Sequence, residues 1–149
     1  MLKPGTRAPS FTATDASGRA WDLAALHGRP FVLTFYPKDE TAGCVAQVCA
    51  FRDVWSDLEP TGVRVFGVSR DDAASHEAFQ KARKLPYELL TDASGAMHKA
   101  FDVGRSFGVT NRVSYLVAAD AVIVDAYEAN LAPARHAQRM LDAARSLAR

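Results

Sequence analysis

The segment 31–36, Phe-Val-Leu-Thr-Phe-Tyr, is an almost unbroken run of β-branched and aromatic residues between Pro30 and Pro37. Successive side chains of a strand point to opposite faces of a sheet, so a run that is apolar at consecutive positions needs cover on both faces. Helices packed on the two sides of a sheet provide that cover. The run therefore predicts a central strand of an α/β fold, and Pro37 ends it.

The residues after Pro37 alternate between helical and extended patterns. Spacings of four, three, four and three, which are typical of one helix face, separate Cys44, Val48, Phe51, Trp55 and Leu58. Pro60 and Gly62 are expected to stop this helix. Residues 63–68 then predict a second strand, and residues 71–84 predict a second helix.

The rest of the chain completes this alternation. Residues before position 30 indicate a small hairpin or an irregular lead-in, residues 89–90 a short extended segment, and residues 96–101 a brief helix. Residues 114–117 and 122–127 predict an antiparallel hairpin, and residues 134–148 predict a closing helix. This order implies a mixed sheet flanked by helices, with its parallel strands joined by crossovers.

Length and charge limit what such a fold does. A chain of 149 residues with 48% hydrophobic and 23% charged residues fits one domain, 1–149. Because 18 basic and 17 acidic residues leave a net charge of +1, we expect no nucleic-acid partner. The apolar stretches are shorter than the roughly 18 residues of a membrane span, so we expect no membrane partner and a cytoplasmic protein.

The two cysteines, Cys44 and Cys49, are too few for a disulfide scaffold, so a role for the pair would be a redox role. Both belong to the segment 37–49, which follows the central strand and opens a helix. The first turn of a helix favours an anion such as a thiolate. Thr41, three residues before Cys44, suits either a helix cap or contact with a bound peroxide.

The pattern Pro37-x-x-x-Thr41-x-x-Cys44 resembles the active-site pattern of the peroxiredoxins. Cys49, five residues later, is similar to the branch called bacterioferritin comigratory protein or peroxiredoxin Q. The likeness covers most of the chain, including the segments 35–39, 51–53 and 112–117. It implies a thioredoxin-like fold and a thiol-dependent peroxidase that reduces hydrogen peroxide and organic hydroperoxides to water or alcohols.

The resemblance also implies a role for five residues. Cys44 would be the peroxidatic cysteine, and Cys49 would resolve its sulfenic acid as an intramolecular disulfide. Thr41 would bind the thiolate and the peroxide, Arg112 would stabilise the thiolate and polarise the O–O bond, and Pro37 would shield the pocket from water. Thioredoxin or a similar dithiol would be the reductant. No cofactor is required, and we expect a monomer or a weak dimer.

Two positions depart from the family pattern. Ala42 replaces the usual proline, and Val45 stands where threonine or serine is common. Both changes bear on the rigidity and hydrogen bonding of the loop rather than on the chemistry.

Helix geometry places a condition on the disulfide. Five helical residues give a rise of about 7.5 Å and a net turn of about 140°, so the two Cα atoms would lie roughly 8–9 Å apart. A disulfide tolerates at most about 7 Å. We therefore expect the helix to unwind after Gly43 once Cys44 is oxidised.

Three other functions use the same residues. A zinc site would combine Cys44 and Cys49 with His98 or His136, but structural zinc usually needs cysteines two to four residues apart. A disulfide reductase generally uses Cys-x-x-Cys. A redox sensor or a thiol-dependent chaperone remains compatible with the sequence. The four histidines are expected at the surface or at helix ends, and Lys38, Asp39 and Glu40 are expected to be solvated.

Overall fold

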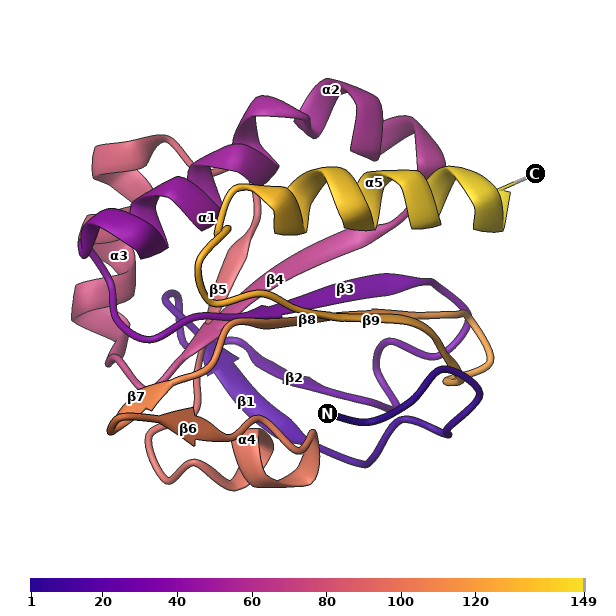
Figure 1. The fold of residues 1–149 in the computed structure, drawn as a ribbon, viewed down its shortest axis with the longest axis horizontal. Coiled ribbons are helices and arrows are strands. Elements are labelled where there is room, and N and C mark those ends of the chain that lie inside the picture. Colours follow the sequence, from indigo (N-terminus) through magenta and orange to yellow (C-terminus); the bar gives the residue numbers. More distant parts are fainter. Residues whose placement is uncertain (149) are drawn as a thin grey trace.

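The fold is described for residues 1–148 by a computed structural model (Figure 1). Its strands are β1 (Thr12–Asp15), β2 (Ala20–Asp22), β3 (Phe31–Phe35), β4 (Arg64–Ser69), β5 (Glu88–Thr91), β6 (Arg105–Ser106), β7 (Val109–Thr110), β8 (Val113–Val117) and β9 (Ile123–Glu128). Its helices are α1 (Ala42–Asp53), α2 (Trp55–Leu58), α3 (Ala73–Arg83), α4 (Ala96–Ala100) and α5 (Arg135–Ala148), with a 3₁₀ turn at Glu59–Thr61.

The main sheet has seven strands in the order β2-β1-β5-β4-β3-β8-β9. Strand β3 lies near its centre, parallel to β4 and antiparallel to β8, and every residue of β3 is buried. Parallel β4 and β5 are joined through α3, just as β3 and β4 are joined through α1 and α2. The predicted mixed sheet with helical crossovers is confirmed.

The two faces of the sheet carry separate cores. Helices α1, α3 and α5 cover one face, and α4 lies on the other side with the N-terminal segment (Figure 1). Along β3, Val32 points into the α1 and α5 side while Phe31, Leu33 and Phe35 point into the other. This alternation follows from the twofold repeat of a strand, and it places Thr34 on the same face as Val32.

The helix that the sequence predicts from Cys44 to Leu58 differs from the observed one. It begins earlier, at Ala42, and it is interrupted at Val54, whose φ of −101° and ψ of 10° lie outside the helical range. The interruption re-aims the next turn, so that Trp55 packs on Tyr87 with ring centroids 5.9 Å apart and Leu58 is fully buried. Spacing alone predicts the apolar face but not this change of direction. In the described part of the chain, no helix has the length and apolar character that crossing a membrane requires.

Candidate active site

The central strands bring two distant segments to one edge of the sheet. Phe35, the last residue of β3, pairs with Val113, the first residue of β8. Because these strands are antiparallel, Arg112 lies beside the chain that leaves β3 through Pro37. The edge holds the carboxyl ends of β3, β4 and β5, which is where α/β sheets usually place their binding sites.

Cys44 lies in the first turn of α1 and is fully buried. Its Sγ accepts two hydrogen bonds, from the backbone N–H of Lys38 at 3.4 Å and from Nη1 of Arg112 at 3.3 Å. Donors aimed at the sulfur, together with the positive end of a helix, stabilise a thiolate over a neutral thiol. The predicted residues Cys44 and Arg112 are therefore in direct contact.

Gln47 belongs to this site, although it was not among the predicted residues. Its side chain is fully buried, and its Oε1 accepts a hydrogen bond from Nη1 of Arg112 at 3.0 Å. Its Nε2 donates to Oγ1 of Thr34 at 2.7 Å and to the carbonyl of Phe35 at 3.1 Å. The signal was present in the sequence, because Gln47 is a polar residue on the apolar helix face of Cys44 and Phe51.

Gly43 has a steric role that spacing did not reveal. A Cβ at this position would lie 2.4 Å from Nη2 of Arg112 and 3.1 Å from its Cζ. The guanidinium is held by Cys44 and Gln47, so it has little freedom to give way. Glycine thus lets Arg112 approach the first turn of α1 closely.

The Thr41 hydroxyl donates to the carbonyl of Lys38 at 2.7 Å and makes no side-chain cap of α1. The capping interpretation is therefore wrong for the side chain, although the Thr41 carbonyl accepts from Val45 N–H at 2.8 Å. The hydroxyl hydrogen is already engaged, so the oxygen retains only its accepting capacity. No hydrogen bond joins it to Cys44 among the described residues.

Asp39 was expected to be solvated, and that expectation is wrong. Its carboxylate is buried and accepts from the Tyr36 hydroxyl at 2.7 Å, from Ser75 Oγ at 2.8 Å and from His76 Nδ1 at 2.7 Å. Burial alone would raise the pKa of Asp39, but the hydrogen bonds from His76 and Tyr36 hold it below its ordinary value. Lys38 and Glu40 are exposed, as expected.

The histidines were expected at the surface or at helix ends: His27 is at the surface, and His76, His98 and His136 lie in the first turns of α3, α4 and α5. His76, His98 and His136 are buried, because each finds a polar partner inside the fold. His98 Nδ1 lies 2.6 Å from Asp92, and His136 Nδ1 lies 2.8 Å from Ser114 Oγ. These partners are side chains of the fold rather than the cysteines, so neither histidine joins them as the zinc hypothesis requires.

Cys49 is half-buried and packs at the edge of the α1 core. Next to it in the chain, the carbonyl of Val48 accepts a hydrogen bond from the hydroxyl of Tyr87. Burial raises the pKa of Tyr87 well above its ordinary value, so this hydroxyl stays a donor. The two cysteines are not bonded to each other, and the unbroken helix between them keeps the geometry that forbids a disulfide.

A cavity of about 380 Å³ opens beside Arg112. Its walls combine the loop before α1, the β6–β7 hairpin and the start of the loop after β9: Pro37, Ser106, Phe107, Val109, Thr110, Asn111, Arg112, Asn130 and Leu131. Phe107 and Leu131 are completely exposed at its rim. Pro37 is half-buried and lines this cavity from the loop that leads to Cys44. An organic molecule could therefore reach Arg112 through an apolar entrance.

A family model, curated sequences and solved structures that resemble this chain all belong to the same family. The model of the AhpC/TSA family matches residues 4–126. A protein of Oryza sativa subsp. japonica named peroxiredoxin Q, chloroplastic, is 41% identical over 98% of this chain and 68% of its own length. The structure of peroxidoxin BcpB from Mycobacterium tuberculosis has a TM-score of 0.91 at 28% identity, covering 99% of both chains.

A second solved structure is the bacterioferritin comigratory protein of Xanthomonas campestris, described for its alkyl peroxide reduction activity. It has a TM-score of 0.86 at 27% identity and covers 93% of this chain and 92% of its own. The expected thioredoxin-like fold is confirmed by these neighbours.

The expected cytoplasmic location is contradicted by the relatives, since the rice protein is named as chloroplastic and so is the relative from Arabidopsis thaliana. The net charge and hydropathy of a folded domain do not distinguish one aqueous compartment from another. Composition therefore could not support that prediction.

Proposed function

Since the chain belongs to the AhpC/TSA family and to its peroxiredoxin Q branch, we propose that Cys44 is the attacking thiol and Cys49 the resolving thiol of this thiol-dependent peroxidase. One observation carries the assignment of Cys44. Its sulfur alone combines full burial at the start of a helix with two donors, Lys38 N–H and Arg112 Nη1. Cys49 has neither feature.

In the first step the Cys44 thiolate attacks one oxygen of the hydroperoxide. An S–O bond forms and the O–O bond breaks, giving a sulfenic acid and an alkoxide, or hydroxide, that takes up a proton. Negative charge grows on the departing oxygen, and Arg112 lies where its guanidinium can stabilise that charge. Thr41, whose own hydrogen is engaged by Lys38, accepts from the peroxide O–H, and Pro37 shields the site from water.

In the second step Cys49 condenses with the sulfenic acid. The Cys44–Cys49 bond forms and water leaves, which consumes the thiol hydrogen of Cys49. Because the Cα atoms of an intact helix lie roughly 8–9 Å apart at this spacing, α1 must unwind locally first. A dithiol reductant of the thioredoxin type then reduces the disulfide, forms its own disulfide and returns two thiols.

The substrate class follows from the cavity beside Arg112. Its rim carries Phe107 and Leu131, so an alkyl hydroperoxide would bury its chain there while its O–O group faces the guanidinium. The activity described for the Xanthomonas campestris relative is of this kind. We infer that organic hydroperoxides are substrates in addition to hydrogen peroxide.

Peptide mapping after one equivalent of peroxide tests the assignment. Intact mass and mapping of the wild type should show loss of two hydrogens and a Cys44–Cys49 link. Cys49→Ser should show sulfenic or sulfinic acid at Cys44, with no link. Oxidation that begins at Cys49 would overturn the assignment.

The same samples separate an enzyme from a redox sensor. With excess dithiothreitol, a peroxidase consumes many equivalents of peroxide for each subunit, whereas a sensor stops after one. Multiple turnover is expected for the wild type.

A further inference from the structure

Two polar residues face each other in the middle of the sheet. Thr34 of β3 and Ser114 of β8 occupy paired positions, both are fully buried, and their hydroxyl oxygens lie 2.8 Å apart. Both point to the face covered by α1 and α5, where Val32 and Leu116 also lie. A buried hydroxyl without a partner is costly, so this pair requires further contacts on that face.

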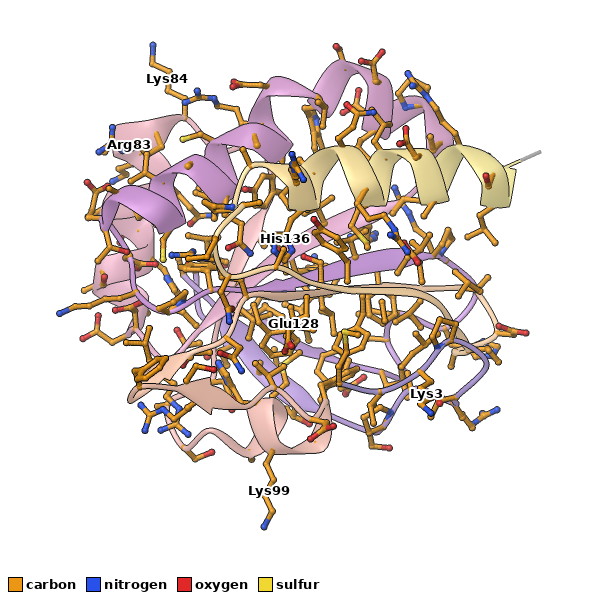
Figure 2. All side chains as sticks on the ribbon, in the orientation of Figure 1. Lys3, Arg83, Lys84, Lys99, Glu128 and His136 are labelled. Carbon is orange, nitrogen blue, oxygen red and sulfur yellow. The ribbon has the colours of Figure 1, made fainter. Side chains whose placement is uncertain are left out.

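Those contacts lead in two directions. On one side Thr34 accepts from Gln47, whose Oε1 holds Arg112 next to Cys44. On the other side Ser114 lies 2.8 Å from Nδ1 of His136 in α5, and Nε2 of His136 lies 3.0 Å from the carbonyl of Ala129. Figure 2 shows His136 between α5 and the sheet. One continuous hydrogen-bonded chain thus joins α5 to the thiol.

The ends of this chain fix its direction. Arg112 can only donate, so the Gln47 oxygen faces it and the Gln47 nitrogen donates to Thr34. Thr34 then donates to Ser114, and Ser114 donates to Nδ1 of His136. The Ala129 carbonyl can only accept, so Nε2 of His136 carries the hydrogen. A neutral imidazole satisfies every group at once.

We propose that His136 is a positioning residue for Arg112, acting through Ser114, Thr34 and Gln47 to keep the Gln47 carbonyl turned towards the guanidinium. The proposal rests on the function assigned above, because it concerns the group that contacts the attacking thiol. Arg112 is thereby held in the geometry that lets it donate to Cys44. Helix α5 thus influences the active site through hydrogen bonds, without a direct hydrogen bond to Cys44 or Arg112 among the described residues.

Protonation of His136 would oppose this arrangement. An imidazolium must donate at Nδ1 to Ser114, so that either Ser114 or Thr34 is left with a hydroxyl hydrogen that has no acceptor unless Gln47 turns over. Gln47 would then present N–H groups to Arg112 and release it.

The surroundings of the imidazole favour its neutral form. Burial lowers the pKa of His136, and the charge of Arg112 acts in the same direction. The other groups facing the ring are Tyr127, whose centroid is 4.9 Å away, and Arg139, which lies over the Tyr127 ring and pairs with Asp125.

The test uses a Cys49→Ser background, in which Cys44 is the only thiol. His136→Leu removes both hydrogen bonds of the ring at similar volume, and His98→Leu is a matched control at a buried histidine in the other core. Two quantities are measured: the pH midpoint of Cys44 alkylation by iodoacetamide, and the rate constant for its oxidation by peroxide.

His136→Leu should move the alkylation midpoint to higher pH and slow oxidation about tenfold. This is the size of effect expected when the hydrogen bond between Gln47 and the charged guanidinium of Arg112 is lost. His98→Leu should change neither quantity. His136→Asn restores an acceptor for Ser114 and should recover most of the rate. Equal behaviour of His136→Leu and His98→Leu would overturn the proposal.

Ser114→Ala interrupts the series of hydrogen bonds between His136 and Thr34 without altering α5. It is the alternative variant if His136→Leu fails to fold, and it should reproduce the shift in the alkylation midpoint. An unchanged midpoint in a folded Ser114→Ala protein would also overturn the proposal. Because alkylation requires no peroxide, this readout stays informative even if the wild type proves not to reduce peroxides.

Discussion

Cys44 and Cys49 lie in the same helix, five residues apart, in very different surroundings. Cys44 is fully buried, and its sulfur accepts hydrogen bonds from Lys38 in the preceding loop and from Arg112 just before β8. Cys49 is half-buried, and Arg83 at the end of α3 and Tyr87 before β5 lie near enough to interact with it electrostatically. Arg52 of α1 donates to the carbonyl of Arg83 at 2.7 Å, and the Arg83 side chain pairs with Glu40, in the loop before α1, at 3.0 Å.

The comparison separates two requirements of the proposed cycle. Attack on a peroxide needs a fixed sulfur with donors around it, whereas disulfide formation needs a helix that can open. Cys49 is only half-buried, whereas Cys44 is fully buried and hydrogen-bonded, so Cys49 is held more weakly than Cys44. The exposed ion pair Arg83–Glu40, which joins α3 to the loop before α1, contributes little to stability. We infer that α1 opens from its contacts with α3 while Thr34 and Ser114 keep their places in the sheet.

The largest difference is expected between the two cysteine variants. Cys44→Ala should abolish peroxide consumption, because no other thiol has donors aimed at its sulfur. Cys49→Ser should keep the rate constant of the first oxidation within about twofold and lose only the disulfide. Stopped-flow measurement with one equivalent of peroxide distinguishes them. Fast oxidation that remains in Cys44→Ala would contradict the assignment of Cys44 as the attacking thiol.

Arg112→Ala should slow the oxidation of Cys44 by about 10²–10³-fold, as expected when a donor to developing negative charge is removed. Arg145→Ala changes an arginine of α5 that pairs with Asp57 of α2, beyond the C-terminal end of α1, and should leave that rate constant nearly unchanged. Both are measured under pseudo-first-order conditions. Equal slowing by the two variants would show that net positive charge, rather than position, is what matters.

Gly43→Ala should lower the oxidation rate about tenfold, because the new Cβ would meet Nη2 of Arg112 at 2.4 Å and displace it. Thermal stability should change little, since alanine favours helices by up to about 1 kcal/mol over glycine. Gly104→Ala is a suitable control, because its Cβ would meet only Asn111 Nδ2, at 3.6 Å. A fully active Gly43→Ala enzyme would contradict the tight fit of Arg112.

Tyr87→Phe should speed disulfide formation about fivefold, because one hydrogen bond to α1, worth about 1 kcal/mol, no longer opposes unwinding. The first oxidation should be unaffected. Quenched mass spectrometry gives the two rate constants separately. A slower disulfide step would mean that the Tyr87 hydroxyl assists the reaction instead of restraining the helix.

Lowering the pH should decrease the free energy of unfolding in two steps. The pKa of His136 is lowered from its ordinary value of 6.5, mainly by burial, and hydrogen bonds lower that of Asp39 from 3.8. In both cases the unfolded chain binds more protons, so the free energy of unfolding falls as the pH drops below each ordinary value. Urea unfolding between pH 8 and 3 measures this. His136→Leu should lose the upper step and keep the lower one.

The elements of the fold were predictable because they depend on local spacing. The spacing from Cys44 has the period of one helix face, and the run 31–36 combines β-branched and aromatic residues with a proline at each end, which favours a buried strand. The contact of Cys44 with Arg112 could not be predicted from local spacing, because 68 residues separate the two in the sequence. The family resemblance predicted it.

Burial of polar residues was not predictable in the same way. Asp39 is buried because His76, 37 residues later, reaches it, and Ser114 is buried because His136 does. Such partners depend on how elements pack, which spacing along one element does not encode. Gln47 is the exception, because a lone polar residue on an apolar helix face already indicates a buried partner. The single-domain assignment and the roles of the five site residues stay predictions.

Amide hydrogen exchange, compared between the reduced and the disulfide-linked protein, tests the central claim most directly. Exchange protection over residues 44–50 should be lost in the oxidised protein, while β3, β8 and α5 keep theirs. Peptide mapping of the same sample confirms the Cys44–Cys49 link. An α1 that keeps full protection while carrying that disulfide would contradict the account.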